Sequence, residues 1–120
     1  MPLEVQPKSL FRLLNHVYEL ERKAAKLADG DAVVRHVRRM RDLFETDFHL
    51  TYEDPAGQPF TETRTDVEAR VAGDSAENLI IIETLKPVIR YSEGPTSSIV
   101  QKGVVVATAR TEPPNAGTTV

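Results

Sequence analysis

Residues 10–27 read LFRLLNHVYELERKAAKL, and their apolar side chains recur at helical spacing. The steps between successive apolar residues alternate between three and four, which is the a/d pattern of a heptad seam. The pattern predicts a helix from Leu10 to Ala28 with Ser9 as its N-cap. The seam consists of Leu10, Leu13, Val17, Leu20, Ala24 and Leu27.

A second amphipathic helix is expected after a short break at residues 29–31, and it should end near Thr46. Gly30 suits a left-handed position after the first helix, and Asp31 can cap the second. A three-residue break between two amphipathic helices predicts an antiparallel helical hairpin. The second helix carries its own seam of Val33, Val37, Met40 and Phe44.

Two helices with one seam each cannot enclose a core alone. They must pack on the rest of the chain or on a second copy of themselves. The regular 3.5-residue period over three heptads favours dimerisation into a four-helix arrangement. An intramolecular hairpin packed on the C-terminal half is the alternative.

The hydrophobic period changes near residue 50. From there on, β-branched runs such as LIII at 79–82 and VVV at 104–106 are separated by turn residues, which is typical of strands. A type I turn is expected at 54–57, the most buried strand at 79–85, and a final hairpin around Lys102-Gly103. Strands are expected over 49–53, 65–72, 79–85, 88–91, 98–101 and 104–109.

These patterns predict an α+β fold with three parts. The helical hairpin, which we expect to dimerise, spans residues 9–47, and a small all-β module spans 48–110. Residues 111–120 contain Pro113-Pro114-Asn115 and Gly117, and this composition predicts a disordered tail.

The composition excludes several classes of protein. The chain has 120 residues, a formal net charge of −3 and no cysteine, which excludes disulfides, thiolate metal sites and cysteine nucleophiles. The acidic balance disfavours nucleic acid and anionic membranes. No run approaches the roughly 20 apolar residues of a membrane helix, and the first residues do not resemble a signal peptide. We expect a cytoplasmic protein.

Metal-binding and catalytic patterns are weak. The three histidines, His16, His36 and His49, lack the spacing of a metal site, although His49 near Asp47 and Glu53 can in principle bind a cation. A lone histidine in a loop more often faces solvent. We expect no metal site and no cofactor.

Glu83 lies within an apolar stretch between Ile82 and Leu85. If buried, its carboxyl would have a raised pKa and could act as an acid or base. The sequence offers it no converging histidine, second acid or nucleophile, and it has no phosphate loop or G-x-S-x-G motif. We therefore expect a protein that is not an enzyme.

The one concentrated basic run lies on the second helix and consists of Arg35, His36, Arg38, Arg39 and Arg41. Arg35, Arg38 and Arg39 share one helix face. A solvated or ion-paired face is the favoured interpretation, because Asp42 and Glu45 lie nearby. Contact with nucleic-acid phosphates or with an acidic protein partner are the alternatives.

Three stretches together resemble GrpE-type nucleotide exchange factors, the co-chaperones of DnaK-type chaperones. Residues 13–22, LLNHVYELER, are similar to a leucine-rich helical segment of that family. Residues 57–60, GQPF, match its glycine-x-proline-phenylalanine motif, and residues 65–67, TDV, stand where the family has histidine-glutamate-alanine. Residues 82–89 and 99–105, IETLKPVI and IVQKGVV, are similar to its closing pair of strands.

The resemblance implies a homodimer whose β module opens the nucleotide cleft of a DnaK-type ATPase and promotes ADP release. It also implies contact residues on turns and exposed strand faces. A phenylalanine beside a turn usually fills a core, however, and lysines are ordinarily solvated. The implied contacts are Gln58, Phe60, Lys86, Pro87, Gln101 and Lys102.

The sequence departs from the family at several of these positions. Thr65 and Asp66 replace the family's histidine and glutamate, and Gln101 replaces the arginine that reaches the chaperone. Lys102 replaces the following proline, Val88-Ile89 replaces a glycine-tyrosine pair, and few residues precede Ser9 where the family has a long helix. A scaffold dimer without exchange activity is therefore the alternative, and a small nucleic-acid-binding dimer is a third hypothesis.

Overall fold

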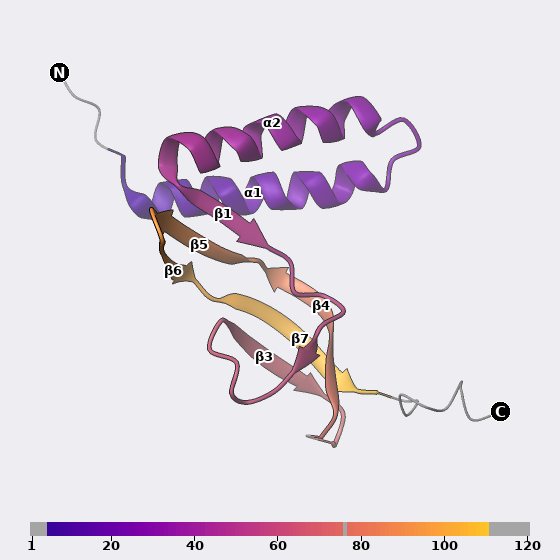
Figure 1. Cartoon of the computed structure of the whole chain (residues 1–120). Coiled ribbons are helices and arrows are strands. Elements are labelled where there is room, and N and C mark those ends of the chain that lie inside the picture. Colours follow the sequence, from indigo (N-terminus) through magenta and orange to yellow (C-terminus); the bar gives the residue numbers. More distant parts are fainter. Residues whose placement is uncertain (1–4, 76, 111–120) are drawn as a thin grey trace.

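The computed structural model describes residues 5–75 and 77–110. Its N-terminal half is a pair of antiparallel helices and its C-terminal half is built of strands (Figure 1). The predicted α+β class is confirmed, whereas the predicted tail at 111–120 lies outside the described residues. The elements are α1 (Pro7–Ala25), α2 (Asp31–Phe48), β1 (Leu50–Glu53), β2 (Pro59–Phe60), β3 (Val67–Ala72), β4 (Leu79–Lys86), β5 (Val88–Glu93), β6 (Thr96–Gln101) and β7 (Gly103–Ala109).

The helix ends differ from the predicted ones. Helix α1 begins at Pro7, because proline suits the first helical position, where the missing N–H needs no partner. Gly30 has a φ of −82° and is the N-cap of α2, so the expected left-handed conformation is wrong. A glycine fits there because a Cβ atom would overlap the carbonyl oxygen of Ala24.

The strands form two sheets. One sheet has the order β1-β5-β6 and is antiparallel throughout. The other has the order β2-β4-β7-β3, in which β3 runs parallel to β7 and the other pairs are antiparallel. The β2 strand, only two residues long, was not predicted.

The chain passes from one sheet to the other three times: between β1 and β2, at Pro87 and at Lys102. The last two crossings form a corner, and this corner overturns one prediction. Strands β6 and β7 do not form a hairpin, because they belong to different sheets. The hairpin is formed instead by β5 and β6, which turn at Gly94-Pro95. Gly103 allows the tight corner, because a Cβ atom there would lie 2.9 Å from a methyl group of Val88.

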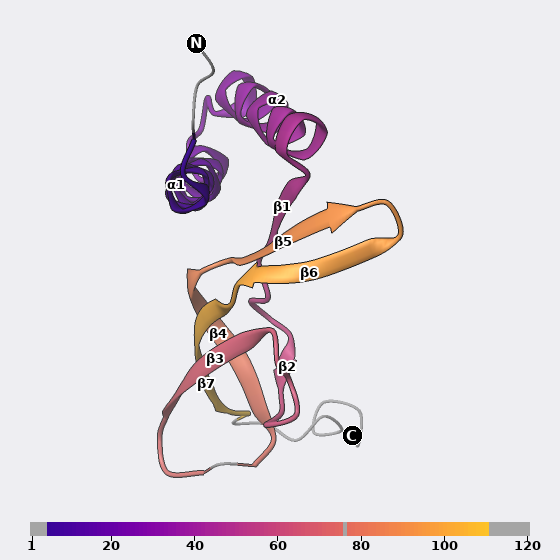
Figure 2. The same ribbon diagram turned by 90° about the vertical axis from the view of Figure 1, so that its left-hand side faces the viewer.

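The helical hairpin of α1 and α2 packs on the three-stranded sheet and forms with it the first of two cores (Figure 2). We call this the hairpin core; its buried residues are Leu14, Val17, Tyr18, Val37, Phe44, Leu50, Tyr52 and Ile89. The second, which we call the sheet core, combines Val67, Ile81 and Val105 of the four-stranded sheet with Val88 of β5. The neighbouring residues Val88 and Ile89 point into different cores, so β5 connects the two.

Strand β4 is less buried than expected. Only Leu79, Ile81 and Thr84 of its eight residues are buried. The pairing of β4 with β7 skips one residue at Ile82 and one at Leu85, and both skipped side chains are exposed. Such bulges turn side chains away from the face that alternation predicts. Strand β7 is more continuously buried.

The turn after β1 is also shifted from the predicted position. The N–H of Gln58 donates to the carbonyl of Pro55 at 3.1 Å, so the turn spans 55–58 and not 54–57. Gly57 occupies the third position with a φ of 88°. A positive φ at that position is characteristic of a type II turn, not of the type I turn that was expected.

Candidate functional site

The predicted seam residues divide between the interior and the surface. Val17 and Ala24 are buried within the hairpin and Leu10 is half-buried, so the first two are not available to a second copy. In contrast, Leu13, Leu20 and Leu27 are 52%, 42% and 60% exposed. Leu13 and Leu20 are seven residues apart and lie on one face of α1, whereas Leu27 lies in the turn beyond the end of α1 at Ala25. We call these three residues the leucine row.

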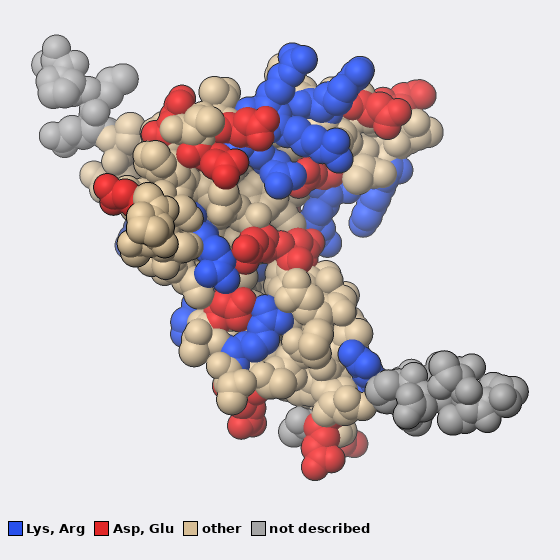
Figure 3. All heavy atoms as spheres, viewed as in Figure 1, with Lys and Arg blue, Asp and Glu red and all other residues tan. Residues whose placement is uncertain are grey.

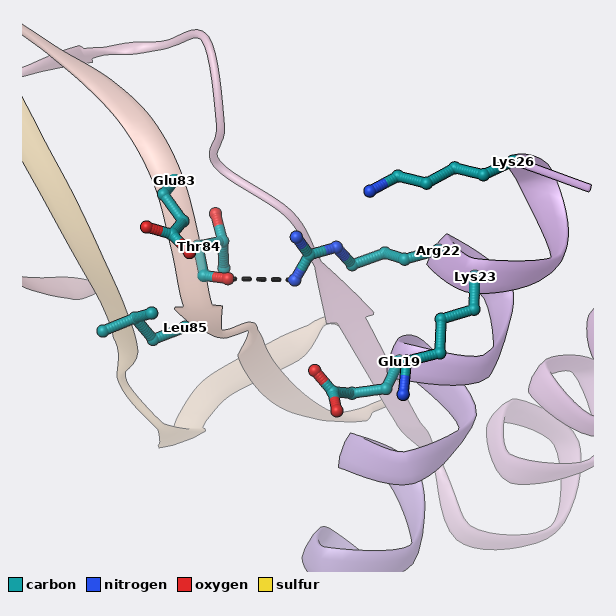
Figure 4. Close-up of a pocket in the computed structure, with 7 residues that line it drawn as sticks. All are labelled: Glu19, Arg22, Lys23, Lys26, Glu83, Thr84 and Leu85. Atoms are coloured by element: carbon teal, nitrogen blue, oxygen red, sulfur yellow. Dashed lines mark hydrogen bonds between the residues drawn. The ribbon is translucent and has the colours of Figure 1, made fainter.

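A polar network connects α1 to the β module at the carboxylate of Asp54. The hydroxyl of Tyr18 donates to this carboxylate at 2.9 Å, and the hydroxyl of Thr84 donates to it at 2.6 Å. The backbone N–H of Ala56 donates to the same group at 2.9 Å. Arg22 extends from α1 and donates to the carbonyl oxygen of Thr84 at 3.1 Å (Figure 4). Its guanidinium also lies 5.4 Å from the ring centre of Tyr18.

A second network joins both helices to β1. The hydroxyl of Tyr52 donates to Glu21 at 2.7 Å, and the guanidinium of Arg41 donates to the other carboxylate oxygen of Glu21 at 2.7 Å. The guanidinium of Arg41 lies 4.9 Å from the ring centre of Tyr52, and the rings of Tyr18 and Tyr52 meet edge to face. Together the two networks fix the orientation of the hairpin on the sheet.

These contacts shift three pKa values. Burial alone would raise the pKa of Asp54, but hydrogen bonds from Thr84, Ala56 and Tyr18 outweigh it and lower the pKa below its ordinary value. Burial and the nearby carboxylate raise the pKa of Tyr18 to about 12. Burial and the hydrogen bond to Glu21 raise the pKa of Tyr52 as well. Both tyrosines are therefore neutral donors at physiological pH.

A groove runs between α1 and β4 beside these networks. Its larger part, of about 260 Å³, is shown in Figure 4. A smaller hollow of about 200 Å³ adjoins it and shares Glu19 and Leu85 with it. Three cations from the C-terminal end of α1, with Glu19 of the same helix beside them, face Glu83 of β4 across the larger part. This arrangement suits a polar binding surface more than an enclosed reaction site. The larger part is lined by Glu19, Arg22, Lys23, Lys26, Glu83, Thr84 and Leu85.

The six predicted contact residues fall into two groups. Gln58 and Phe60 lie at β2, and Phe60 pairs with Leu79 at the start of β4. The other four lie at the corner where the chain changes sheets: they are the last residues of β4 and β6 and the residue that follows each. Six residues of strand separate the two groups, which corresponds to roughly 20 Å. The corner group consists of Lys86, Pro87, Gln101 and Lys102.

Only part of each group is available to a partner. Phe60 is half-buried and packs against the sheet core, so it fills a core as phenylalanines beside turns usually do. Pro87 is fully buried. Gln58, Lys86 and Lys102 are exposed.

Gln101 is occupied by contacts within the chain. Its side-chain amide forms a reciprocal pair with the amide of Asn15 on α1, at 3.0 and 2.9 Å. The same Nε2 group donates to the carbonyl oxygen of Pro87 at 2.9 Å. The residue at the family's arginine position thus connects α1 to the corner of the β module.

Arg64 has a structural role that sequence reasoning missed. Its guanidinium forms two hydrogen bonds to Asp66, at 3.0 and 2.8 Å. It also donates to the side chain of Gln58 and to the carbonyl of Pro59, each at 3.1 Å. It therefore holds the loop after β2 against the start of β3. The sequence signal for this ion pair was an arginine two residues before an aspartate.

The arginines of the basic run on α2 differ in their ion pairing. Basic side chains gather over α2 in Figure 3. Arg35, Arg38 and Arg39 are exposed and form no ion pair with any other described residue, whereas Arg41 is paired with Glu21. A shallow hollow of about 410 Å³ lies beside Arg35 and Arg38.

The candidate chemical residues do not converge on a site. Glu83 is exposed, because the bulge at Ile82 turns it out of the interior. His49 ends α2 with a φ of 59°, and its ring lies edge-on to Tyr91 at 6.0 Å. Within residues 5–75 and 77–110, no group of three or more potential ligands is placed to hold a metal ion.

Neither described helix is both long and apolar enough to cross a membrane.

In comparisons with known proteins, no family model, no curated protein and no solved structure matches the chain significantly.

Proposed function

We propose that this chain is a GrpE-like co-chaperone that forms a homodimer through its helical hairpin. In this proposal its β module binds the nucleotide-binding domain of a DnaK-type chaperone in the cytoplasm and promotes ADP release. The observation that supports it best is the leucine row. A hairpin whose own core is already filled, yet which keeps Leu13 and Leu20 exposed on one face of α1 and Leu27 exposed just beyond it, suits packing against a second hairpin.

The proposed mechanism requires no chemistry and no cofactor from this chain. The β module would favour the open form of the nucleotide cleft by binding it more tightly than the closed form. By linkage, the factor can weaken the affinity of the chaperone for ADP only as far as it binds the open form more tightly than the closed form, and ATP binding would expel the factor. The corner of the β module is the proposed contact, because Lys86 and Lys102 are exposed there beside the rigid pair of Gln101 and Asn15.

The direct test is release of a fluorescent ADP analogue from the DnaK-type chaperone of the same organism. Acceleration that ATP reverses supports the proposal. The double variant Lys86→Ala, Lys102→Ala should then lose most of the acceleration. The matched control is Arg70→Ala with Lys8→Ala, which removes two exposed cations outside the corner and outside the groove. Equal release with and without the protein would overturn exchange activity.

A scaffold dimer without exchange activity is the second candidate, and Gln101 is the observation that favours it. Its amide is bound to Asn15 and to Pro87, so it has little capacity to reach a partner as the family's arginine does. Binding to the chaperone without faster ADP release would support this function.

A further inference from the structure

Two sheets leave four edge strands, and three of these edges are protected. Strand β1 has only four residues and packs beside α2. Strand β2 has two residues and contains Pro59. Strand β3 carries Glu68 and Arg70, both exposed. Short length, proline and charge are the usual means by which edge strands avoid pairing with other chains.

Strand β6 has none of these protections. Its six residues read TSSIVQ, without a charged residue or proline. It pairs with β5 on one side, and no other described backbone group bonds to residues 96–101. The β5–β6 hairpin extends away from the rest of the β module (Figure 2). One side of β6 therefore presents a row of unpaired backbone donors and acceptors.

A hollow of about 360 Å³ lies on one face of this hairpin. Tyr91 pairs with Ser98 and Glu93 pairs with Thr96, so all four side chains share that face. The hydroxyl of Tyr91 donates to Glu93 at 3.3 Å, and Glu93 forms no ion pair with another described residue. The hollow thus offers one exposed carboxylate beside the open edge.

We propose that β6 binds an extended peptide segment of a partner protein as an additional strand, with a lysine or arginine of that segment against Glu93. Backbone hydrogen bonds to an edge strand supply affinity in this mode, and alternate side chains supply specificity. A second copy of β6 is the less suitable occupant, since it would bring no charged side chain of its own to the hollow. This inference does not depend on the proposed exchange activity.

The test uses two nine-residue peptides of alternating threonine and valine, one with a central lysine and one with a central glutamate. Hydrogen–deuterium exchange of the full chain is measured with each peptide. The lysine peptide should protect the amides of residues 96–101 and bind about fivefold more tightly than the glutamate peptide, given the strength of an exposed ion pair. The variant Glu93→Gln should reduce that ratio to near one, whereas Glu68→Gln on β3 should leave it unchanged.

Two proline variants test the edge itself. The N–H groups of Ser97 and Ser98 point to opposite sides of β6, so one proline removes an outward donor and the other disrupts pairing with β5. The variant that keeps the wild-type melting temperature should lose peptide binding. Unchanged binding by that variant, or protection that avoids residues 96–101, would overturn the proposal. Protection that appears without peptide and rises with protein concentration would also overturn it, in favour of pairing between copies.

Discussion

The hairpin core and the sheet core hold the molecule together in different ways. The hairpin core contains Tyr18 and Tyr52, whose hydroxyls bond to Asp54 and Glu21 on neighbouring elements. The sheet core contains aliphatic residues only among its buried members. Directional hydrogen bonds thus fix the orientation of the helical hairpin on the β module, whereas the sheet core is held together by the packing of apolar side chains. All three tyrosines lie in or against the hairpin core, so tyrosine fluorescence reports on the unfolding of that core.

The largest effect is expected from Ile89→Ala, which opens the hairpin core at a fully buried position. It should lower the free energy of unfolding by about 3 kcal/mol, within the range for large-to-small core substitutions. Urea unfolding followed by tyrosine fluorescence and by far-UV circular dichroism measures the loss. Ile82→Ala, the same change at an exposed position, is the matched control and should cost little.

The same experiment tests whether the cores unfold together. Because Val88 and Ile89 are neighbours on β5, the two signals should change at the same urea concentration in the wild type. If tyrosine fluorescence changes first, the cores are separate cooperative units.

A smaller effect is expected from Gly103→Ala at the corner between the sheets. The new methyl group would approach Val88 to 2.9 Å and Val67 to 3.1 Å, so these side chains must shift. Overpacking of this kind costs about 2 kcal/mol. Lys102→Ala, at the exposed neighbouring residue, is the control for thermal unfolding. Equal melting temperatures for both variants would mean that the corner is not tightly packed.

The variant Asp54→Asn tests how much the directional hydrogen bonds to Asp54 stabilise the helical hairpin on the β module. The pKa of Asp54 is lowered in the folded state, so its stabilisation is complete above its ordinary pKa and disappears as the pH falls through the lowered value. The variant should be less stable than the wild type by about 1 kcal/mol at neutral pH, a modest cost because Asp54 remains partly accessible to solvent. This difference should shrink as the pH falls below about 4.

Urea unfolding at neutral and acidic pH measures the effect, with the exposed Asp29→Asn as control. A difference that does not change with pH would show that the Asp54 charge does not orient the hairpin.

Local pattern was sufficient to predict much of the fold. The order of the elements, both helices and most strands follow from the change of hydrophobic period near residue 50. The sheet assignment of β6 and β7 could not be predicted, since it depends on non-local pairing and on the space that Gly103 leaves. The bulges at Ile82 and Leu85 likewise have no mark in the sequence.

The site was predicted less completely for the same reason. The bonds of Tyr18 and Thr84 to Asp54 join residues 36 and 30 positions apart, which periodicity does not connect. The seam was predicted as one set, but a helix in contact with both another helix and a sheet buries more than one line of residues. Val17 and Ala24 therefore lie inside, and Leu13 and Leu20 lie outside.

The smallest effect on folding is expected from the double variant Leu13→Glu, Leu20→Glu. Both side chains are exposed and glutamate is a good helix former, so each change should alter the free energy of unfolding by less than about 0.5 kcal/mol. The proposed dimer should nevertheless dissociate, because two charges would face the partner hairpin. Light scattering after gel filtration measures this, with Val17→Glu as the contrasting variant that should unfold the hairpin core. A wild-type chain that stays monomeric at high concentration would rule out the four-helix arrangement, and the leucine row would then need a different partner.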